Sequence, residues 1–459
     1  MNPHGNRPAR PLVVLNCVGL TPAHLGADTP HLSRLANEGF HNPVHSALPA
    51  VTTTAQATML TGVDPAQHGI VANGWYFRDL NEIFLWRQSE ALVCAPHVWE
   101  GQPWKVLKHF WWYAMNTTAR ATVTPRPVYH HDATKSPDFY ANPPELKQLL
   151  QQKHGTFPLF NFWGPTASAE STRWIADSFI TAWEDQKPDL GLCYLPHLDY
   201  DLQRFGPTGP HLAPNLREID ACAGRIIEAA RGMNAQILVV SEYGISRVSD
   251  AAFPNRVLRE AGLLKVSTNA AGELIDTGAS KAFVVCDHQI AHVYIKDPAD
   301  VSAVKALLSK IPSVAKTLLR HESTTIGLNH PRSGELILLA EPGFWFAYDY
   351  WLEDAKKPDF AQSVEIHKKP GYDPRELFFD PKGGKLRAAK ALLRKKLGFR
   401  YLLNPCSLDP KLVRGSHGLA ASREEDGPVL ICSEKSLAGH RPQHHRDVAG
   451  IIRNALKAD

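Results

Sequence analysis

Strand-like apolar segments that alternate with helix-like segments constrain the fold of this chain more than any other feature. Residues 12–18 form a continuous apolar run of strand length, and residues 30–38 follow with helical spacing. The same order returns later, where strand-like runs at 191–196 and 236–241 flank a predicted helix at 214–231. This alternation is typical of a mostly parallel sheet with helices on both faces. We therefore predict an α/β fold of this kind.

Polar side chains lie near the end of each of these strand-like runs. Asn16 ends the first run, Asp199 follows the second and Glu242 follows the third. Ligand sites of open parallel sheets lie beyond the carboxyl ends of the strands. The sequence therefore predicts that these three side chains converge on one site.

Two regions break the alternation and divide the chain into predicted parts. Residues 75–164 are rich in aromatic residues and in proline-containing loops, and residues 246–370 contain further strand-like runs with a helix near 300–310. We predict a core over residues 10–245 that carries the aromatic-rich region as an insertion. We interpret 246–370 as a cap, and residues 371–459 as a return to the core that carries His417.

The composition is that of an ordinary globular protein. Apolar residues make up 44% of the 459 residues and charged residues 21%, which excludes long disorder. The net charge of +4 is spread thinly and gives no reason to expect nucleic-acid binding. Residues 382–400 concentrate basic side chains in a predicted amphipathic helix; a solvated face is the ordinary interpretation, and contact with an anion or a membrane surface is the alternative.

The cysteines and the first apolar run indicate in which cellular compartment the protein is expected. The seven cysteines are scattered without CxxC spacing, as expected for reduced thiols. The first apolar run, of about seven residues, is too short for a signal sequence or a membrane span. We expect a cytoplasmic protein with no membrane span.

A cluster of hydroxyl residues opens a predicted helix after residue 51. Thr52, Thr53 and Thr54 lie where the helix begins, and Gly62 lies where it ends. The backbone N–H groups of such a helix start, together with the helix dipole, attract an anion such as phosphate. Threonines at this position also act as ordinary helix caps, so the cluster alone leaves both interpretations open.

The longer motif is more specific. Residues 48–74 (LPAVTTTAQATMLTGVDPAQHGIVANG) resemble the nucleophile segment of the nucleotide pyrophosphatase/phosphodiesterase branch of the alkaline phosphatase superfamily. The resemblance implies an alkaline phosphatase-like fold and places the family's nucleophile on Thr52. An asparagine that contacts a phosphoryl oxygen in the family is replaced here by Ala55, and His68 matches a residue of loop packing.

Other pieces of the family pattern follow in order, with several residues changed. The family's first metal-binding Asp corresponds to Asn16, and its Asp-His pair after a later strand corresponds to Glu242 and Tyr243. Its middle Asp is kept as Asp199, but the His four residues later is replaced by Gln203. The late His is kept as His417 in the run Gly-Ser-His-Gly.

The resemblance implies two metal sites, one on each side of a phosphoryl group. Asp199, Gln203 and His417 would form one site, and the other would be formed by Asn16, Thr52, Glu242 and Tyr243. Only one imidazole remains, and amide and carboxylate oxygens favour magnesium, manganese or calcium over a full two-zinc site. One cation, or none, is also compatible with these replacements.

Replacement ligands could come from the predicted cap. Asp287, His288 and His292 lie at or near a connection between two predicted strands, from which they could reach the open end of the sheet. A histidine in such a connection is more often structural, so a role in binding metal or substrate is the less common interpretation.

These residues predict a metal-dependent phosphoryl-transfer hydrolase with a Thr52 nucleophile. Its substrate would be a small-molecule or nucleotide-like phosphate ester, and the sequence leaves a monoester and a diester equally open. The alternative is a non-hydrolytic metabolite-binding protein, or a mutase or lyase, with degenerate metal sites on the same scaffold.

Overall fold

A computed structural model describes residues 8, 10–131, 134–440 and 442–457. Its centre is an eight-stranded sheet with the strand order β2-β22-β11-β1-β10-β5-β6-β9. The five strands from β11 to β6 run parallel, β22 and β9 run antiparallel to them, and β2 pairs antiparallel with β22. The bounds are β2 (Phe40–Pro43), β22 (Val429–Cys432), β11 (Gln236–Val240), β1 (Leu12–Cys17), β10 (Leu190–Leu195), β5 (Val106–His109), β6 (Ala121–Pro125) and β9 (Phe139–Asn142).

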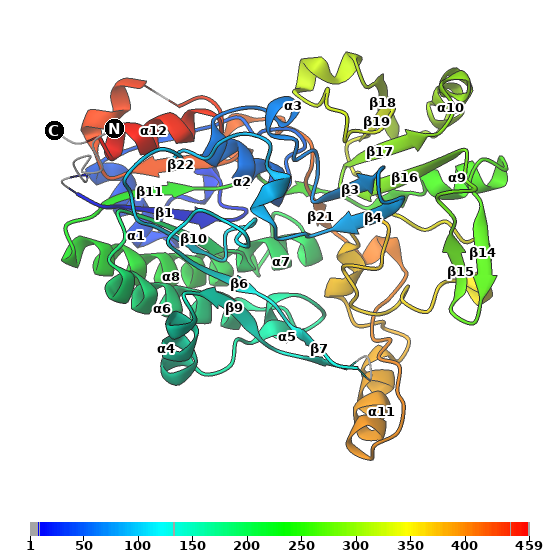
Figure 1. Ribbon diagram of the computed structural model, residues 1–459, viewed down its shortest axis with the longest axis horizontal. Coiled ribbons are helices and arrows are strands. Elements are labelled where there is room, and N and C mark those ends of the chain that lie inside the picture. Colours follow the sequence, from blue (N-terminus) through cyan, green and yellow to red (C-terminus); the bar gives the residue numbers. More distant parts are fainter. Residues whose placement is uncertain (1–7, 9, 132–133, 441, 458–459) are drawn as a thin grey trace.

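Helices cover both faces of this sheet, as Figure 1 shows. Side chains of β1 alternate between the two faces: Val13 and Leu15 join the core under α1 (Pro30–Glu38), α6 (Ala169–Gln186) and α8 (Leu212–Gly232). Leu12 and Val14 join the core under α2 (Thr52–Thr61) and α12 (Asp447–Ala455). The predicted α/β class is therefore confirmed.

A second sheet lies beyond the carboxyl ends of the parallel strands of the central sheet (Figure 1). It has the order β16-β17-β19-β18 and is antiparallel throughout. Its own core is separate from the two cores of the central sheet. The bounds are β16 (Ala282–Asp287), β17 (Ile290–Ile295), β19 (Leu336–Ala340) and β18 (Val314–Leu319), with α9 (Pro254–Glu260) and α10 (Val301–Leu308) beside them.

The aromatic-rich region is arranged differently from the prediction. Residues 75–164 were expected to be an insertion, but β5, β6 and β9 of the central sheet all lie within them. β5 and β6 could not be predicted from an apolar run, because the buried residues Lys108, Thr122 and Thr124 interrupt it. The division of the chain into a core, a cap and a return segment stays a prediction.

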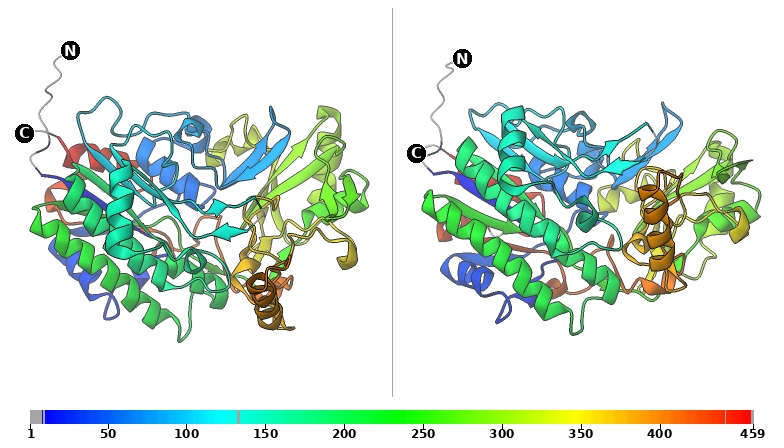
Figure 2. Two further views of the ribbon diagram at one scale, coloured as in Figure 1. Left: turned by 60° about the horizontal axis from the view of Figure 1, so that its bottom comes forward. Right: turned by 90° about the horizontal axis from the view of Figure 1, so that it is seen from below.

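Two further helices matter below. Helix α7 (His197–Phe205) follows β10 directly and carries Asp199. Helix α11 (Gly384–Lys396) projects from the rest of the molecule, which Figure 2 shows from two further sides. Among the residues described, no helix is long and apolar enough to cross a lipid bilayer.

Candidate active site

Helix α2 directs one of the three threonines at its start towards the carboxyl end of the sheet. The hydroxyls of Thr53 and Thr54 donate to the carbonyls of Ala72 and Ile70, which lie in the segment after the helix. Both hydroxyls are therefore hydrogen-bonded within the fold. Thr52 Oγ1 instead lies 3.3 Å from the Tyr243 hydroxyl, with which it shares a hydrogen bond. The N-cap of α2 is Val51, whose side chain makes no capping hydrogen bond, and the backbone N–H of Thr53 donates instead to Asn73 Oδ1. The capping interpretation of the threonines is therefore wrong.

Glu242 is buried beside Thr52 and is hydrogen-bonded by neutral amides. Its Oε1 accepts from Asn16 Nδ2 at 2.6 Å and from Gln56 Nε2 at 2.7 Å. Burial raises the pKa of Glu242 to about 8, although hydrogen bonds from Gln56, Asn16 and Thr52 act in the opposite direction. Asn16 Oδ1 and Glu242 Oε2 find no hydrogen-bond partner among the described residues.

Asp199 repeats this arrangement on α7. Its Oδ2 accepts from Gln203 Nε2 at 2.6 Å, and its Oδ1 is buried without a partner in the described part of the chain. Burial raises the pKa of Asp199 to about 7, although the hydrogen bond from Gln203 acts in the opposite direction. Gln203 Oε1 in turn accepts from the Tyr372 hydroxyl at 3.0 Å, so both ends of this amide are hydrogen-bonded.

His417 faces Asp199 with its unprotonated nitrogen. His417 Nδ1 donates to the carbonyl of Ala50 at 2.7 Å, which leaves the lone pair on Nε2, 3.9 Å from Asp199 Oδ1. The rings of Tyr243 and His288 each pack against the His417 ring at a centroid distance of 3.6 Å. Burial lowers the pKa of His417 well below its usual value, which favours the neutral ring.

The turn between β16 and β17 reaches this site. Asp287 Oδ2 accepts from the backbone N–H of Asn73 at 2.7 Å, and Asp287 Oδ1 accepts from His288 Nδ1 at 2.6 Å. Asn73 Oδ1 accepts from the backbone N–H of Thr53, which ties the turn to the start of α2. His288 Nε2 is buried without a partner among the described residues. Asp287 and His288 therefore lie beside His417.

His292 and His68 lie outside this arrangement. His292 Nε2 donates to the carbonyl of Val71, and its Nδ1 accepts from the N–H of Gly334. His68 shares a hydrogen bond with Thr58 and accepts one from the N–H of Ile70. Because both ring nitrogens are occupied in each case, these histidines stabilise the loops around them.

The potential metal-ligand atoms buried near Thr52 suit a hard cation better than zinc. Asn16 Oδ1, Asp199 Oδ1 and Glu242 Oε2 are oxygens whose hydrogen-bonding capacity is unused among the described residues. Oxygen ligands suit magnesium, manganese and calcium, and His417 Nε2 adds a single nitrogen. Gln203 fits less well, because Tyr372 already donates to its oxygen.

A different group of side chains meets a purely geometric criterion for metal binding. Within the described ranges, Glu90, His97 and Glu100 are the one set of His, Cys, Asp and Glu whose ligand atoms lie within 4.8 Å of one another. Lys108 Nζ lies 3.0 Å from Glu90 Oε2 and compensates its charge. An ammonium group at this position removes the need for a metal ion.

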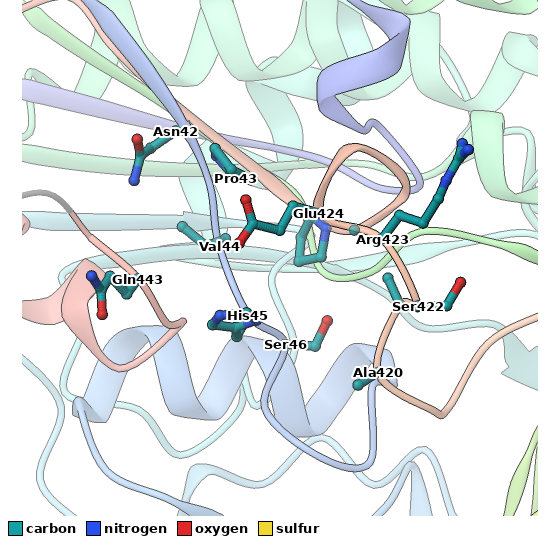
Figure 3. Close-up of a pocket in the computed structure, with 13 residues that line it drawn as sticks. Asn42, Pro43, Val44, His45, Ser46, Ala420, Ser422, Arg423, Glu424 and Gln443 are labelled. Carbon is teal, nitrogen blue, oxygen red and sulfur yellow. The ribbon is translucent and has the colours of Figure 1, made fainter.

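An open cavity lies next to the backbone of Glu242 and is drawn in Figure 3. It has a volume of about 450 Å³ and is lined by residues 42–46, 420–424, 427, 428 and 443, none of which is a predicted site residue. Ser46, one of its lining residues, donates to the backbone carbonyl of Glu242. A narrow crevice lined by Trp86, Trp163 and Tyr372 lies nearer to Gln203. Tyr372 thus lines this crevice and also donates to Gln203.

Gln56 and Tyr372 were not foreseen from the sequence. Gln56 lies four residues after Thr52 on the same helix, so helical spacing could have indicated that it shares a face with Thr52. Tyr372 comes from a loop far away along the chain, and no local signal relates it to Gln203.

Comparison with known proteins agrees with this architecture. The family model described as type I phosphodiesterase / nucleotide pyrophosphatase matches residues 12–373. An uncharacterized pyrophosphatase/phosphodiesterase of Schizosaccharomyces pombe is 27% identical over 236 residues, which cover 48% of this chain and 42% of that protein. Bovine ectonucleotide pyrophosphatase/phosphodiesterase family member 3 is 22% identical over 48% of this chain and 22% of its own length. The chain thus matches less than half the length of these curated relatives.

Solved structures resemble nearly the whole chain. Phosphonoacetate hydrolase from Sinorhizobium meliloti, in complex with phosphonoformate, has a TM-score of 0.60 at 15% identity and covers 98% of this chain and 96% of its own. Inactive murine ectonucleotide pyrophosphatase/phosphodiesterase 5 in complex with AMP has the same TM-score at 14% identity, with the same coverage. At these identities the likeness establishes the fold alone.

Proposed function

Since this chain belongs to the type I phosphodiesterase/nucleotide pyrophosphatase family, we propose that it hydrolyses a phosphate ester of a small or nucleotide-like molecule, with Thr52 as the nucleophile. The Thr52 oxygen attacks phosphorus and forms a phosphothreonine ester as the alcohol leaves. Water then attacks the same phosphorus, which releases phosphate or a monoester and restores the hydroxyl.

One observation carries this proposal. The Thr52 hydroxyl lies at the start of α2 beside buried carboxyl groups whose free oxygens have no partner among the described residues. Unpaired buried carboxylates cost free energy unless a cation or a proton compensates them. The family is described as phosphodiesterases and pyrophosphatases, and a hydroxyl nucleophile beside a cation would serve that reaction.

A hard divalent cation is the compensating group that we propose. Asp199 with His417, or Glu242 with Asn16, would hold it, since each pair lies close together and offers ligand atoms that have no partner among the described residues. One ion would not join all four, because the ligand atoms of Asp199, Glu242 and His417 do not all lie within 4.8 Å of one another. Such a cation would neutralise phosphoryl charge and lower the pKa of the Thr52 hydroxyl. The chain's own residues keep Thr52 in place and exclude water, because Thr52 is only 4% exposed.

The substrate that we propose is a diester rather than a monoester. Among the hydrogen bonds and ion pairs of the described residues, none joins Thr52, Asp199 or Glu242 to a lysine or arginine. A monoester carries an additional negative charge, which usually requires such a side chain. The singly charged phosphoryl group of a diester needs less compensation.

A matched pair of substitutions tests the nucleophile. Thr52→Val removes the hydroxyl at nearly constant volume, and we expect turnover of bis-p-nitrophenyl phosphate with Mn²⁺ to fall about a thousandfold or more. Thr54→Val is the control, because it removes a buried hydroxyl of the same helix that bonds to Ile70 instead. Turnover by Thr52→Val that equals the control would eliminate Thr52 as the nucleophile.

A second candidate is a non-hydrolytic protein, or a mutase or lyase, on the same scaffold. The specific observation in its favour is that neutral amides already bond one oxygen of each carboxyl group: Gln203 bonds Asp199, and Asn16 and Gln56 bond Glu242. Protonated carboxyl groups could then persist without any metal. Elemental analysis combined with the diester assay separates the candidates, since only the hydrolase needs both metal and turnover.

We also propose that the reaction takes place in the cytoplasm. All seven cysteines are free thiols and six of them are buried. Unpaired thiols of this kind are typical of reducing compartments.

A further inference from the structure

The segment around α11 is an excursion that leaves and re-enters the body of the protein at one point. The backbone N–H of Asp380 donates to the carbonyl of Pro405 at 2.8 Å, and Phe379 forms a β-bridge with Cys406. Residues 381–404 therefore form a loop that is closed by these two contacts. Figure 1 and Figure 2 show α11 standing away from both sheets.

The inner face of α11 is fixed against the returning chain. Gly384, Arg387, Ala388 and Ala391 follow one another at helical spacing, and they are the buried or half-buried residues of the helix. A Cβ at Gly384 would lie 2.4 Å from the carbonyl of Pro405, so the backbones touch there. Arg387 donates to Asp380 and to the carbonyl of Asn404. This face sets the orientation of the helix.

The opposite face carries a row of exposed leucines. Leu386, Leu393 and Leu397 fall within about 40° of one another at 3.6 residues per turn. Their exposed fractions are 76%, 57% and 62%. Leu392, Phe399 and Leu402 are also more than half exposed, so six of the twelve large exposed apolar side chains of the described residues lie between 386 and 402. Such a concentration marks an interaction surface.

The same excursion is strongly basic. No acidic residue occurs from 382 to 408, and eight basic residues do: Lys382, Lys385, Arg387, Lys390, Arg394, Lys395, Lys396 and Arg400. Among the ion pairs of the described residues, only Arg387 of this set takes part in one, with Asp380. On the helix, Lys390 and Arg394 lie on one side of the leucine row, and Lys385 and Lys396 lie on the other.

We propose that this surface, α11 with the residues up to Leu402, binds the face of an anionic lipid bilayer. A helix with a leucine row between two basic borders lies in the plane of the membrane, where the leucines enter the headgroup boundary and the cations meet lipid phosphates and carboxylates. The short helix anchors the protein on the membrane and does not cross it.

Other occupants fit this surface less well. A second copy of the chain would bring two equally basic surfaces together, which like-charge repulsion opposes. A nucleic acid would satisfy the cations but would leave the exposed leucines without a partner. Only an anionic bilayer uses both features of the surface.

Vesicle sedimentation with the full chain tests this proposal. We expect binding to vesicles that contain about 30% phosphatidylserine to exceed binding to pure phosphatidylcholine vesicles at least about tenfold, and to weaken with salt. The triple variant Leu386→Ser/Leu393→Ser/Leu397→Ser should lose about tenfold or more in the partition coefficient. Replacing each of Lys390, Arg394 and Lys396 with Glu should remove the preference for anionic lipid.

The matched control replaces exposed apolar residues elsewhere. Leu80→Ser/Phe205→Ser/Leu352→Ser changes side chains that are 60%, 52% and 50% exposed, and it should bind vesicles like the wild type. Thermal unfolding by circular dichroism shows whether each variant folds. The proposal is overturned by absence of vesicle binding, by an equal loss in the control, by leucine-dependent dimers in light scattering, or by RNA binding that exceeds lipid binding.

Discussion

Two buried groups of carboxylates in this protein are compensated in opposite ways. In the ionic cluster, defined as Asp349, Lys369, Asp373, Arg375 and Glu376, the protein supplies its own cations. Arg375 Nη2 lies 2.6 Å from Asp349 Oδ2, and Lys369 Nζ lies 2.9 Å from Asp373 Oδ2. Asp199 and Glu242 are equally buried but receive hydrogen bonds only from neutral groups among the described residues.

The pKa values of Asp373, Asp199 and Glu242 follow this difference, whereas burial raises the pKa of Glu376 despite the charge of Lys369. Burial alone would raise the pKa of Asp373, but the charges of Arg375 and Lys369 bring it below its usual value. Burial raises the pKa of Asp199 to about 7 and that of Glu242 to about 8, since no cationic side chain opposes it. The ionic cluster is therefore complete as folded, whereas the candidate site gains from an added cation or from protons.

The largest effect is expected in the ionic cluster. Arg375→Met leaves Asp349 and Asp373 buried without their shared guanidinium, and we expect a loss of about 3–5 kcal/mol in the free energy of unfolding. Chemical denaturation measures this loss. Arg423→Met is the control, because its partner Asp426 is on the surface, and it should leave the denaturation midpoint unchanged. A midpoint for Arg375→Met equal to that of the control would mean that the cluster is not structural.

The candidate site should respond to pH in the opposite direction from an ordinary salt bridge. Asp199 and Glu242 have raised pKa values, so between pH 5 and 7 the folded protein holds protons that the unfolded chain releases. Relative to the Asp199→Asn/Glu242→Gln variant, metal-free wild type should therefore lose stability as pH rises, by about 4 kcal/mol across this window, about 2 from each carboxyl group. The comparison with the variant cancels the buried histidines, whose lowered pKa values act in the opposite direction. Mn²⁺ should restore more stability at pH 8 than at pH 5. A stability difference in EDTA, wild type minus variant, that rises across the window would contradict this account.

A smaller effect distinguishes the two kinds of carboxylate directly. Glu242→Gln removes an unpaired buried charge, and we expect metal-free protein at pH 8 to gain about 1 kcal/mol while diester turnover is lost. Glu273→Gln is the matched control, since Glu273 is also buried but is paired with Arg259 at 3.0 Å. It should destabilise the protein and keep turnover. Equal shifts in the two variants would remove the distinction.

Local patterns were enough to predict most of the fold and part of the candidate site. The apolar runs predicted β1, β10 and β11. The resemblance of residues 48–74 to a family's nucleophile segment, rather than a local pattern, singled out Thr52, and its role stays a prediction. Strands β5 and β6 were missed, because buried Lys108 and Thr122 depend on tertiary partners that no local pattern reveals. Tyr372 was missed for the same reason, since a long-range contact brings it to Gln203.

Titration of metal-free protein with Mn²⁺ at pH 8, followed by calorimetry, tests the central claim most directly. If Asp199 and Glu242 are the charges of a cation site that serves Thr52, the wild type binds Mn²⁺ saturably. Glu242→Gln should then weaken binding by at least about tenfold, the loss typical even for outer-shell partners of a metal. Wild-type protein that turns over diesters without binding any divalent cation would contradict the account.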